Sequence, residues 1–249
     1  MDELTLLTEL HIDGERQGPG SEAMTRRAIE LAGLGGCPDL RILDIGCGTG
    51  AATLVLARET GARIVAVDFL RPFLDRLQER ARAAGLGGRI QERCIDMNDL
   101  DFAEESLDVV WSEGAVYNLG FERGIRAWRP WLKRGGVLAV SELTWLTQSR
   151  PRELESYWQE TYSEVATAGV KISQLEAAGF RLLGYFPLPE SCWLKHYYEP
   201  LRERLRLLDS RHPNCAVAQA LVQSENREID LYERFANHVS YGFYIAARV

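Results

Sequence analysis

Residues 41–50 read Arg-Ile-Leu-Asp-Ile-Gly-Cys-Gly-Thr-Gly, and this stretch decides the fold. Its first half is a short apolar run that is typical of a buried strand. Its second half has a glycine at every second position, directly before a helical pattern over 51–59. Glycine allows a tight turn and lets a ligand approach without a Cβ atom in the way. The stretch therefore predicts a strand, a ligand-binding loop and a helix with an electropositive N-terminus.

Strand and helix patterns alternate along the rest of the chain. We expect further strands over 63–67, 89–95, 107–111, 136–141, 180–186 and 241–247. We expect helices over 22–31, where Ser21 is the N-cap, and over 72–84, 122–131, 152–168 and 172–178. Alternation at this spacing favours a parallel sheet with helices on both faces. The predicted fold is α/β, a Rossmann-like, doubly wound, mostly parallel seven-stranded sheet with a helical insertion before the last strand.

The insertion gives the domain organisation. We expect one domain, with an N-terminal segment and helix over 1–37, a core sheet over 38–189, a helical cap over 190–238 and a last strand over 239–249. The cap is too rich in Leu, Trp and Tyr to be disordered. One interpretation is a cover which, with residues 16–21, encloses a substrate and excludes water. The alternative is a helical flank that only extends the core.

Charge and composition exclude several classes of protein. The 249 residues include 36 acidic and 29 basic side chains, a net charge of −7, which disfavours nucleic-acid binding. No apolar run is long enough for a bilayer, and the N-terminus lacks a secretory pattern. The five cysteines form no CxxC pair, so we expect reduced thiols, a cytoplasmic location and no metal site. No membrane partner is expected, and a homodimer stays open.

Asp44 discriminates between possible ligands of the glycine loop. With Ala51, the loop also satisfies the GxGxxA form of the dinucleotide fingerprint, so the glycines alone do not choose a cofactor. An acid two positions before the first glycine would repel a pyrophosphate and attract an ammonium group. S-adenosylmethionine carries an ammonium group and therefore fits better than NAD. The structural alternative is a strand-end acid that caps loop amides.

Two later acids are consistent with a nucleoside ligand. Asp68 ends the second predicted strand, where a carboxylate can accept both ribose hydroxyls, in NAD enzymes as well. Asp96 follows the third strand and is placed to accept the adenine amino group, with Met97 against the ring. The alternative for Asp96 is a solvated loop acid.

These segments resemble a known motif series. Residues 41–50, Asp68, residues 96–97 and residues 107–115 are similar to class I S-adenosylmethionine-dependent methyltransferases, strongly over 38–145 and more loosely in the last two strands. The overall pattern is closest to the small-molecule branch that includes ubiquinone-biosynthesis-like enzymes. The resemblance implies S-adenosyl-L-methionine as the cofactor. The implied cofactor-binding residues are Asp44, Gly46, Cys47, Gly48, Gly50, Asp68, Phe69, Asp96, Met97 and Ser112.

Candidates for the chemistry lie beyond the fourth and fifth strands. Glu113 is predicted as a general base or as a group that orients a substrate amine, and Tyr117 as a wall of the acceptor pocket. Trp145, Trp193 and Tyr197 are predicted to line the substrate site. The alternatives are a loop acid bonded to backbone amides for Glu113 and core packing for the aromatic residues.

The sequence thus predicts an enzyme that transfers a methyl group from S-adenosylmethionine to a small molecule. One alternative is an NAD(P)-dependent oxidoreductase, which Asp44 argues against. A second is a non-catalytic protein that binds S-adenosylmethionine. A nucleic-acid methyltransferase is a third, weakened by the acidic charge and by the absence of an Asn-Pro-Pro-Tyr-type tetrapeptide after the fourth strand.

Overall fold

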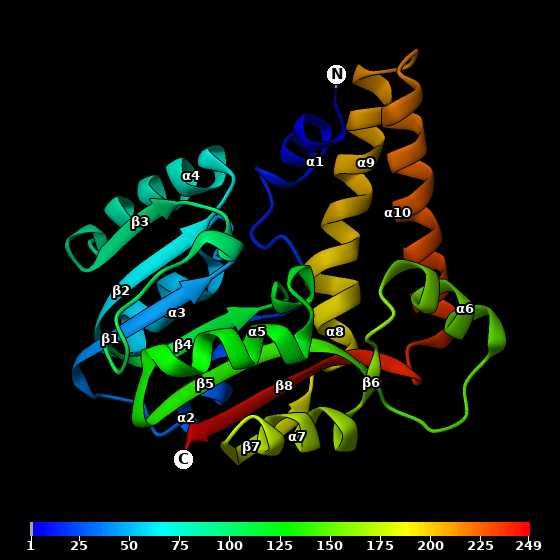
Figure 1. Ribbon diagram of the computed structural model, residues 1–249. Coiled ribbons are helices and arrows are strands. Elements are labelled where there is room, and N and C mark those ends of the chain that lie inside the picture. The colour runs from blue at the N-terminus through cyan, green and yellow to red at the C-terminus, as the bar shows by residue number, and fades with distance from the viewer. Residues whose placement is uncertain (1) are drawn as a thin grey trace.

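The computed structural model describes residues 2–249 and has one mixed sheet flanked by helices (Figure 1). The strand order is β3-β2-β1-β4-β5-β8-β7; β8 runs antiparallel to both β5 and β7, and the pairs from β3 to β5 are parallel. The strands are β1 (Pro38–Ile45), β2 (Gly61–Asp68), β3 (Ile90–Cys94), β4 (Leu107–Glu113), β5 (Leu132–Trp145), β7 (Phe180–Pro187) and β8 (Val239–Arg248). These seven strands confirm the predicted sheet.

The helices are α1 (Glu3–His11), α2 (Glu22–Leu31), α3 (Ala51–Glu59), α4 (Arg71–Ala83), α5 (Phe121–Trp128), α6 (Arg152–Thr161), α7 (Ala168–Ala177), α8 (Glu190–Trp193), α9 (Glu199–Arg211) and α10 (Ala216–Phe235). Single turns are η1 (Gly87–Arg89), η2 (Met97–Asp99), η3 (Val116–Asn118) and η4 (Arg129–Trp131), and η5 (Leu194–Tyr198) is a π-helical segment. The helix predicted over 152–168 ends early, because the chain turns so that β6 (Ala166–Thr167) pairs with the end of β5. Helix α1 was not predicted.

Two hydrophobic clusters cover the two faces of the sheet. Successive residues of β1 alternate between them, since strand side chains point to opposite faces. Ile42 packs with α2, α3 and α4, whereas Leu43 packs with α5 and α7. Helices therefore cover both faces of the sheet, as is usual for parallel sheets. A ligand site is then expected at the carboxyl ends of β1 to β4.

The segment between β7 and β8 is helical, as predicted, and consists of α8, η5, α9 and α10; it is called the cap below. Helices α9 and α10 lie side by side and project beyond the sheet, and α1 lies beside α9 (Figure 1). The Nε atom of Arg204 on α9 donates to the carbonyl of Leu10 at 2.8 Å, and the ring of Tyr197 stacks on His11 at 6.3 Å. The N-terminus and the cap therefore form one layer. Across residues 2–249, every helix is too short or too polar to span a membrane.

Candidate active site

The glycine loop lies between β1 and α3, as predicted. Gly46, Gly48 and Gly50 have φ angles of 71°, 54° and 89°, a left-handed region that L side chains rarely adopt. The backbone amides of Gly46 and Cys47 donate to the carbonyl of Val67 on β2 at 2.9 and 3.0 Å. The loop is therefore fixed to the neighbouring strand and keeps a bare backbone surface.

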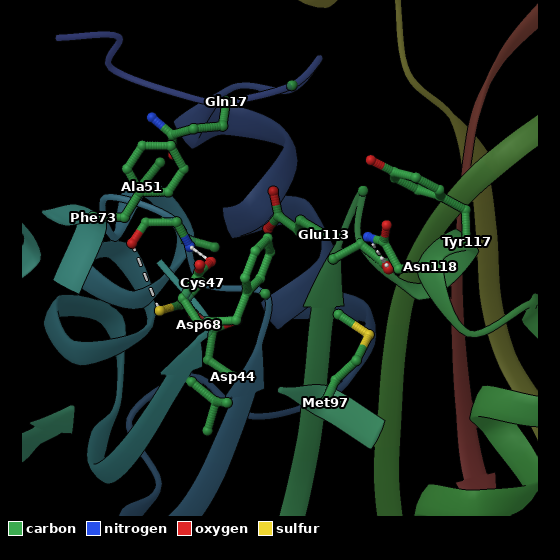
Figure 2. Close-up of a pocket in the computed structure, with 18 of the residues that line it drawn as sticks. Gln17, Asp44, Cys47, Ala51, Asp68, Phe73, Met97, Glu113, Tyr117 and Asn118 are labelled. Atoms are coloured by element: carbon green, nitrogen blue, oxygen red, sulfur yellow. Dashed lines mark hydrogen bonds between the residues drawn. The ribbon is translucent and has the colours of Figure 1, made fainter. Parts of the chain in front are cut away.

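A cavity of about 370 Å³ opens above this loop, at the carboxyl ends of β1, β2, β3 and β4 (Figure 2). Of the predicted cofactor residues, it is lined by Asp44, Gly46, Cys47, Gly48, Asp68, Phe69, Asp96 and Met97. Sequence reasoning missed an apolar wall that consists of Val67, Phe73 and Ile95. This wall and Met97 together form a nonpolar surface of the cavity that also contains Asp68, at the end of β2, and Asp96, after β3.

Asp44 lies at the floor of the cavity and is 1% exposed. Its Oδ2 atom accepts a hydrogen bond from the Thr53 hydroxyl at 2.6 Å, and its Oδ1 atom has no hydrogen-bond partner within residues 2–249. Burial raises the pKa of Asp44 to about 7, because the carboxylate has lost its water. A cationic ligand group beside Oδ1 would restore the charged form.

Asp68 braces the loop from the end of β2. Its Oδ2 accepts from the amide of Gly48 and its Oδ1 from the amide of Leu70, both at 2.9 Å. Burial raises the pKa of Asp68, and the backbone hydrogen bonds partly offset that rise. Asp96 is more exposed, and hydrogen bonds from the Asn98 backbone and side chain lower its pKa. Each carboxylate has lone pairs left for ligand hydroxyl or amino groups.

Residues 13–20, here named the N-terminal strap, cross the mouth of the cavity. Gln17 lies against Gly48, occupying the space that a side chain there would need. Its Oε1 accepts from the amide of Thr49 at 2.9 Å, and its Nε2 donates to the Thr49 hydroxyl at 3.0 Å. Arg80 on α4 holds the strap from the other side through the carbonyls of Gly14 and Glu15.

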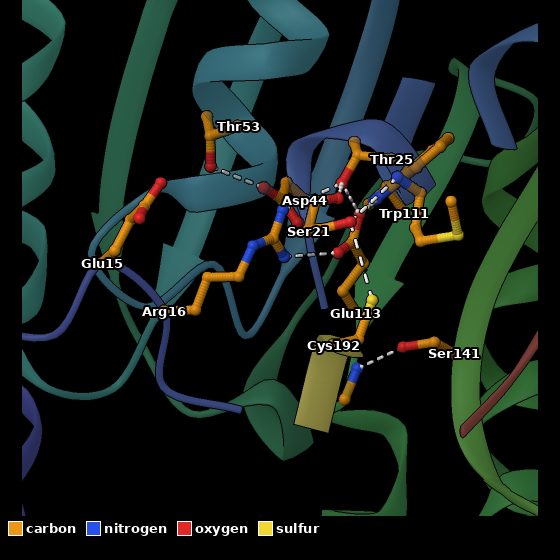
Figure 3. Close-up of polar contacts among 12 residues, drawn as sticks. Glu15, Arg16, Ser21, Thr25, Asp44, Thr53, Trp111, Glu113, Ser141 and Cys192 are labelled. Atoms are coloured by element: carbon orange, nitrogen blue, oxygen red, sulfur yellow. Dashed lines mark hydrogen bonds and ion pairs between the residues drawn. The ribbon is translucent and has the colours of Figure 1, made fainter. Parts of the chain in front are cut away.

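Glu113 holds the same strap through Arg16 (Figure 3). Its Oε2 forms an ion pair with Arg16 at 2.8 Å, with both side chains at most 10% exposed. Its Oε1 accepts from the Thr25 hydroxyl at 2.8 Å and from Trp111 Nε1 at 3.0 Å. Since both oxygens are engaged, the arrangement argues against the predicted role as a general base, and Glu113 instead holds the strap through Arg16.

The structure brings only some of the other predicted residues to the cavity. Tyr117 lines it and is 45% exposed. Ser112 does not, because its hydroxyl donates to the carbonyl of Ile45 and ties β4 to β1. Gly50 is the N-cap of α3 and packs against Leu77.

The three predicted substrate residues lie outside this cavity. Trp193 is 1% exposed, stacks on Tyr232 at 4.4 Å and donates its Nε1 to the Ser240 hydroxyl. Trp145 is buried at the end of β5 under Arg150, whose guanidinium lies 4.5 Å above its ring. Trp193 is therefore a core residue of the cap, contrary to its predicted position. Tyr197 lies in η5 and is not among the residues that line the cavity.

No cluster of three or more metal-ligating side chains occurs in the described part of the chain, and the five cysteines are unpaired. Burial raises the pKa of the Cys47 thiol well above its usual value, so this residue presents its backbone rather than a thiolate to the cavity.

Residues 42–136 match a family model described as a methyltransferase domain. The chain is 31% identical over 104 residues to the methyltransferase GfsG of Streptomyces halstedii, which covers 41% of this chain and 37% of that protein. It is 26% identical over 204 residues to the sterol 24-C-methyltransferase ERG6A of Gibberella zeae, covering 77% of this chain and 53% of that protein. The chain thus spans between a third and just over half of these curated relatives.

Solved structures resemble the whole chain. An S-adenosylmethionine-dependent methyltransferase from Geobacter sulfurreducens, in complex with S-adenosyl-L-homocysteine, is 16% identical and superposes with a TM-score of 0.85 over 98% of both chains. A second such methyltransferase, from Thiobacillus denitrificans, is 17% identical, with a TM-score of 0.85 over 100% of this chain and 99% of that one. At these identities the likeness concerns the fold. Residues 42–136 thus match a methyltransferase domain, and the whole chain shares the fold of these two S-adenosylmethionine-dependent methyltransferases.

Proposed function

We propose that this protein binds S-adenosylmethionine in the cavity above the glycine loop and transfers its methyl group to a small molecule. The observation that carries the proposal is the unpaired Oδ1 of buried Asp44, below a bare glycine backbone and near a second acid, Asp68. An ammonium group next to Asp44 would compensate a buried charge whose cationic neighbour, Arg16, is already paired with Glu113. NAD offers only phosphates to that position.

The residues of the cavity fit the rest of the cofactor by their chemistry. Asp68 would accept the ribose hydroxyls, and Asp96 the adenine amino group. Phe73, Ile95 and Met97 would cover the adenine ring with apolar surface. The backbone of the glycine loop would face the methionine part.

S-adenosylmethionine supplies an electrophilic methyl group on a positively charged sulfur, and the sulfur leaves as a neutral thioether. The protein therefore has no leaving group to protonate. Its tasks are to align the acceptor and to exclude water. The strap, closed by the Arg16–Glu113 ion pair, would exclude water above the cofactor. Tyr117 and Asn118, at the end of the cavity beyond β4, would face the acceptor.

The acceptor class is proposed only as a small molecule. The named activities of the relatives differ, since they include sterol and phosphoethanolamine methylation. The ubiquinone-biosynthesis-like branch also stays a proposal. The unpaired cysteines favour a reducing compartment such as the cytoplasm.

Calorimetry with S-adenosylmethionine, S-adenosylhomocysteine and NAD tests the cofactor. We expect the first two to bind and NAD not to bind, and Asp44→Asn to abolish binding of both. Labelled S-adenosylmethionine incubated with a metabolite extract, followed by mass spectrometry, then tests transfer. NAD binding without a response to S-adenosylhomocysteine would refute the proposal. Cofactor binding without any labelled product would leave the non-catalytic alternative.

A further inference from the structure

A group of tyrosine and glutamate side chains adjoins the cavity at the end where Tyr117 lies. We name it the tyrosine–glutamate face and define it as Tyr117, Tyr197, Tyr241, Glu225 and Glu228. These residues come from η3, η5, β8 and α10, so the cap and the sheet both contribute. Figure 2 shows Tyr117 on the opposite side of Glu113 from Asp68, away from the proposed ribose position.

Tyr241 and Tyr117 join this face to the cavity. The ring of Tyr241 packs over Gly114, since a Cβ atom on that glycine would lie 2.9 Å from Tyr241 Cε2. Gly114 directly follows β4 and lines the cavity, as Tyr117 does. The face therefore begins at the end of β4, the position at which the acceptor is proposed to meet the methyl group.

The two acids of the face lack a cationic partner. Glu228 accepts hydrogen bonds from Tyr198 at 2.9 Å and from Tyr157 at 3.3 Å. Glu225 makes no hydrogen bond to any residue from 2 to 249, and neither acid has a Lys, Arg or His nitrogen of that range within 4.0 Å. Burial raises the pKa of Glu225 to about 7, and the charge of Glu228 adds to the rise.

Tyr197 provides a second, independent observation. Its side chain is more than nine-tenths buried, yet its hydroxyl has no hydrogen-bond partner within the described chain. Burial raises the pKa of Tyr197 well above its usual value, and the charges of Glu225 and Glu228 raise it further. The Tyr197 ring lies 5.2 Å, centroid to centroid, from that of Tyr198, whose hydroxyl donates to Glu228, so direct contacts join Tyr197 to the acids of α10. Arg204 also lies near Tyr197, but its Nε is bound to the carbonyl of Leu10.

A neighbouring buried cation does not neutralise these acids. Lys171 on α7 lies 4.4 Å above the ring of Phe121, and the charges acting on it are those of Glu142 and Glu164. Glu142 is in turn bound to the Tyr162 hydroxyl at 3.3 Å. The charge of Lys171 thus acts on Glu142 and Glu164, and it forms no ion pair with Glu225 or Glu228.

We propose that the tyrosine–glutamate face binds the positively charged nitrogen of an amine or ammonium acceptor. Glu225 and Glu228 would supply the compensating negative charge, and the rings of Tyr117, Tyr197 and Tyr241 the aromatic surfaces that attract a cation. This inference rests on the proposed methyl transfer, because it gives the acceptor that would lie beside the methyl group. A neutral hydroxylated acceptor would need the hydroxyls but not the two carboxylates.

The test uses matched probes on protein saturated with S-adenosylhomocysteine. Choline and tetramethylammonium are titrated by calorimetry, with 3,3-dimethylbutan-1-ol as the uncharged isostere of choline. We expect an ammonium probe to bind and the isostere to bind at least about tenfold more weakly, on the scale of a desolvated cation–aromatic contact. Failure of S-adenosylhomocysteine itself to bind refutes the proposed function and is observed before any probe is added.

Variants then locate the site. Glu225→Gln should weaken choline binding about tenfold, and Tyr197→Phe should weaken it less, since the ring stays. Glu233→Gln, an exposed acid of the same α10 helix paired with Arg202, is the matched control and should change nothing. The inference is overturned by equal binding of choline and its isostere. It is likewise overturned if neither ammonium probe binds to the loaded protein, or if Glu225→Gln binds choline as the wild type does.

Discussion

At the scale of single residues, Asp68 joins the fold of the loop to the proposed ribose contact. Its two oxygens already accept from the amides of Gly48 and Leu70, so a ligand would use the remaining lone pairs of a preorganised carboxylate. We expect Asp68→Asn to weaken S-adenosylhomocysteine binding about tenfold to a hundredfold, as charged hydrogen bonds contribute roughly 1.5–3 kcal/mol. Calorimetry measures this. Asp96→Asn, at a more exposed position, should weaken S-adenosylhomocysteine binding less. Equal losses of affinity in the two variants would contradict this order.

The same scale shows what sequence can and cannot predict. Asp44, Asp68 and the glycines were predictable because the loop and strand-end acids form a local pattern with fixed spacing. Glu113 was predicted as a general base or as a group that orients a substrate amine. Its ion pair with Arg16 was not predicted, because Arg16 lies 97 positions earlier and no local pattern joins the two residues. Trp193 was predicted to line a pocket, but it stacks on Tyr232 in the core of the cap. The sequence does not indicate this contact, because core and pocket aromatic residues look alike in an insertion.

At the scale of elements, the strap and the cap are the parts that sequence described least well. Helix α1 has Asp2 as its N-cap, accepting from the amide of Thr5, and buries Leu6 and Leu10 at a spacing of four. Both signals are present in the sequence, but the helix is only nine residues long and depends on packing against α9.

The strap depends on its buried ion pair. Glu113→Gln leaves the Arg16 guanidinium without a carboxylate, and breaking a buried pair typically costs about 3–5 kcal/mol. We expect the strap to open, so that trypsin cleaves after Arg16 faster and bound S-adenosylhomocysteine dissociates at least about tenfold faster. Proteolysis time courses and stopped-flow measurements follow both. Glu15→Gln removes an exposed acid from the same strap and should behave as the wild type; unchanged dissociation in Glu113→Gln would exclude a closing role.

The cap depends on Trp193. Its ring is buried between Tyr198, Tyr232 and Tyr241. Trp193→Ala should lower the free energy of unfolding by about 3–5 kcal/mol, with Trp193→Phe losing less. Urea unfolding measures the loss. Cofactor affinity, measured where both proteins are folded, should stay within a few fold. If Trp193→Ala had wild-type stability but impaired methyl transfer, Trp193 would instead belong to the substrate site.

At the scale of the whole molecule, buried acids make stability depend on pH. Burial raises the pKa values of Asp44, Glu142 and Glu225 to about 7, whereas unfolded carboxyl groups titrate near pH 4. Between these values the unfolded chain has released protons that the folded protein still holds, so stability falls as the pH rises from about 4 to 7. His11 acts in the opposite direction, since burial lowers its pKa to about 4. The contributions of these three acids and of His11 to stability therefore oppose each other over this pH range.

Asp44 contributes to this loss of stability and also belongs to the proposed cofactor site. The variant Asp44→Asn measures its contribution separately. An amide retains the hydrogen bond from Thr53 without a charge to desolvate, so the ligand-free variant should be more stable than the wild type at pH 8 by up to a few kcal/mol. At pH 4 to 5 the advantage should shrink towards zero, because the wild-type carboxyl is then protonated. Urea unfolding across this range measures both, with Asp101→Asn as an exposed control. If the difference in free energy of unfolding between Asp44→Asn and the wild type did not change with pH, Asp44 would not be buried in its charged form. The proposed ammonium contact requires the charged form, so the residue that stabilises the ligand should be the one that destabilises the empty protein.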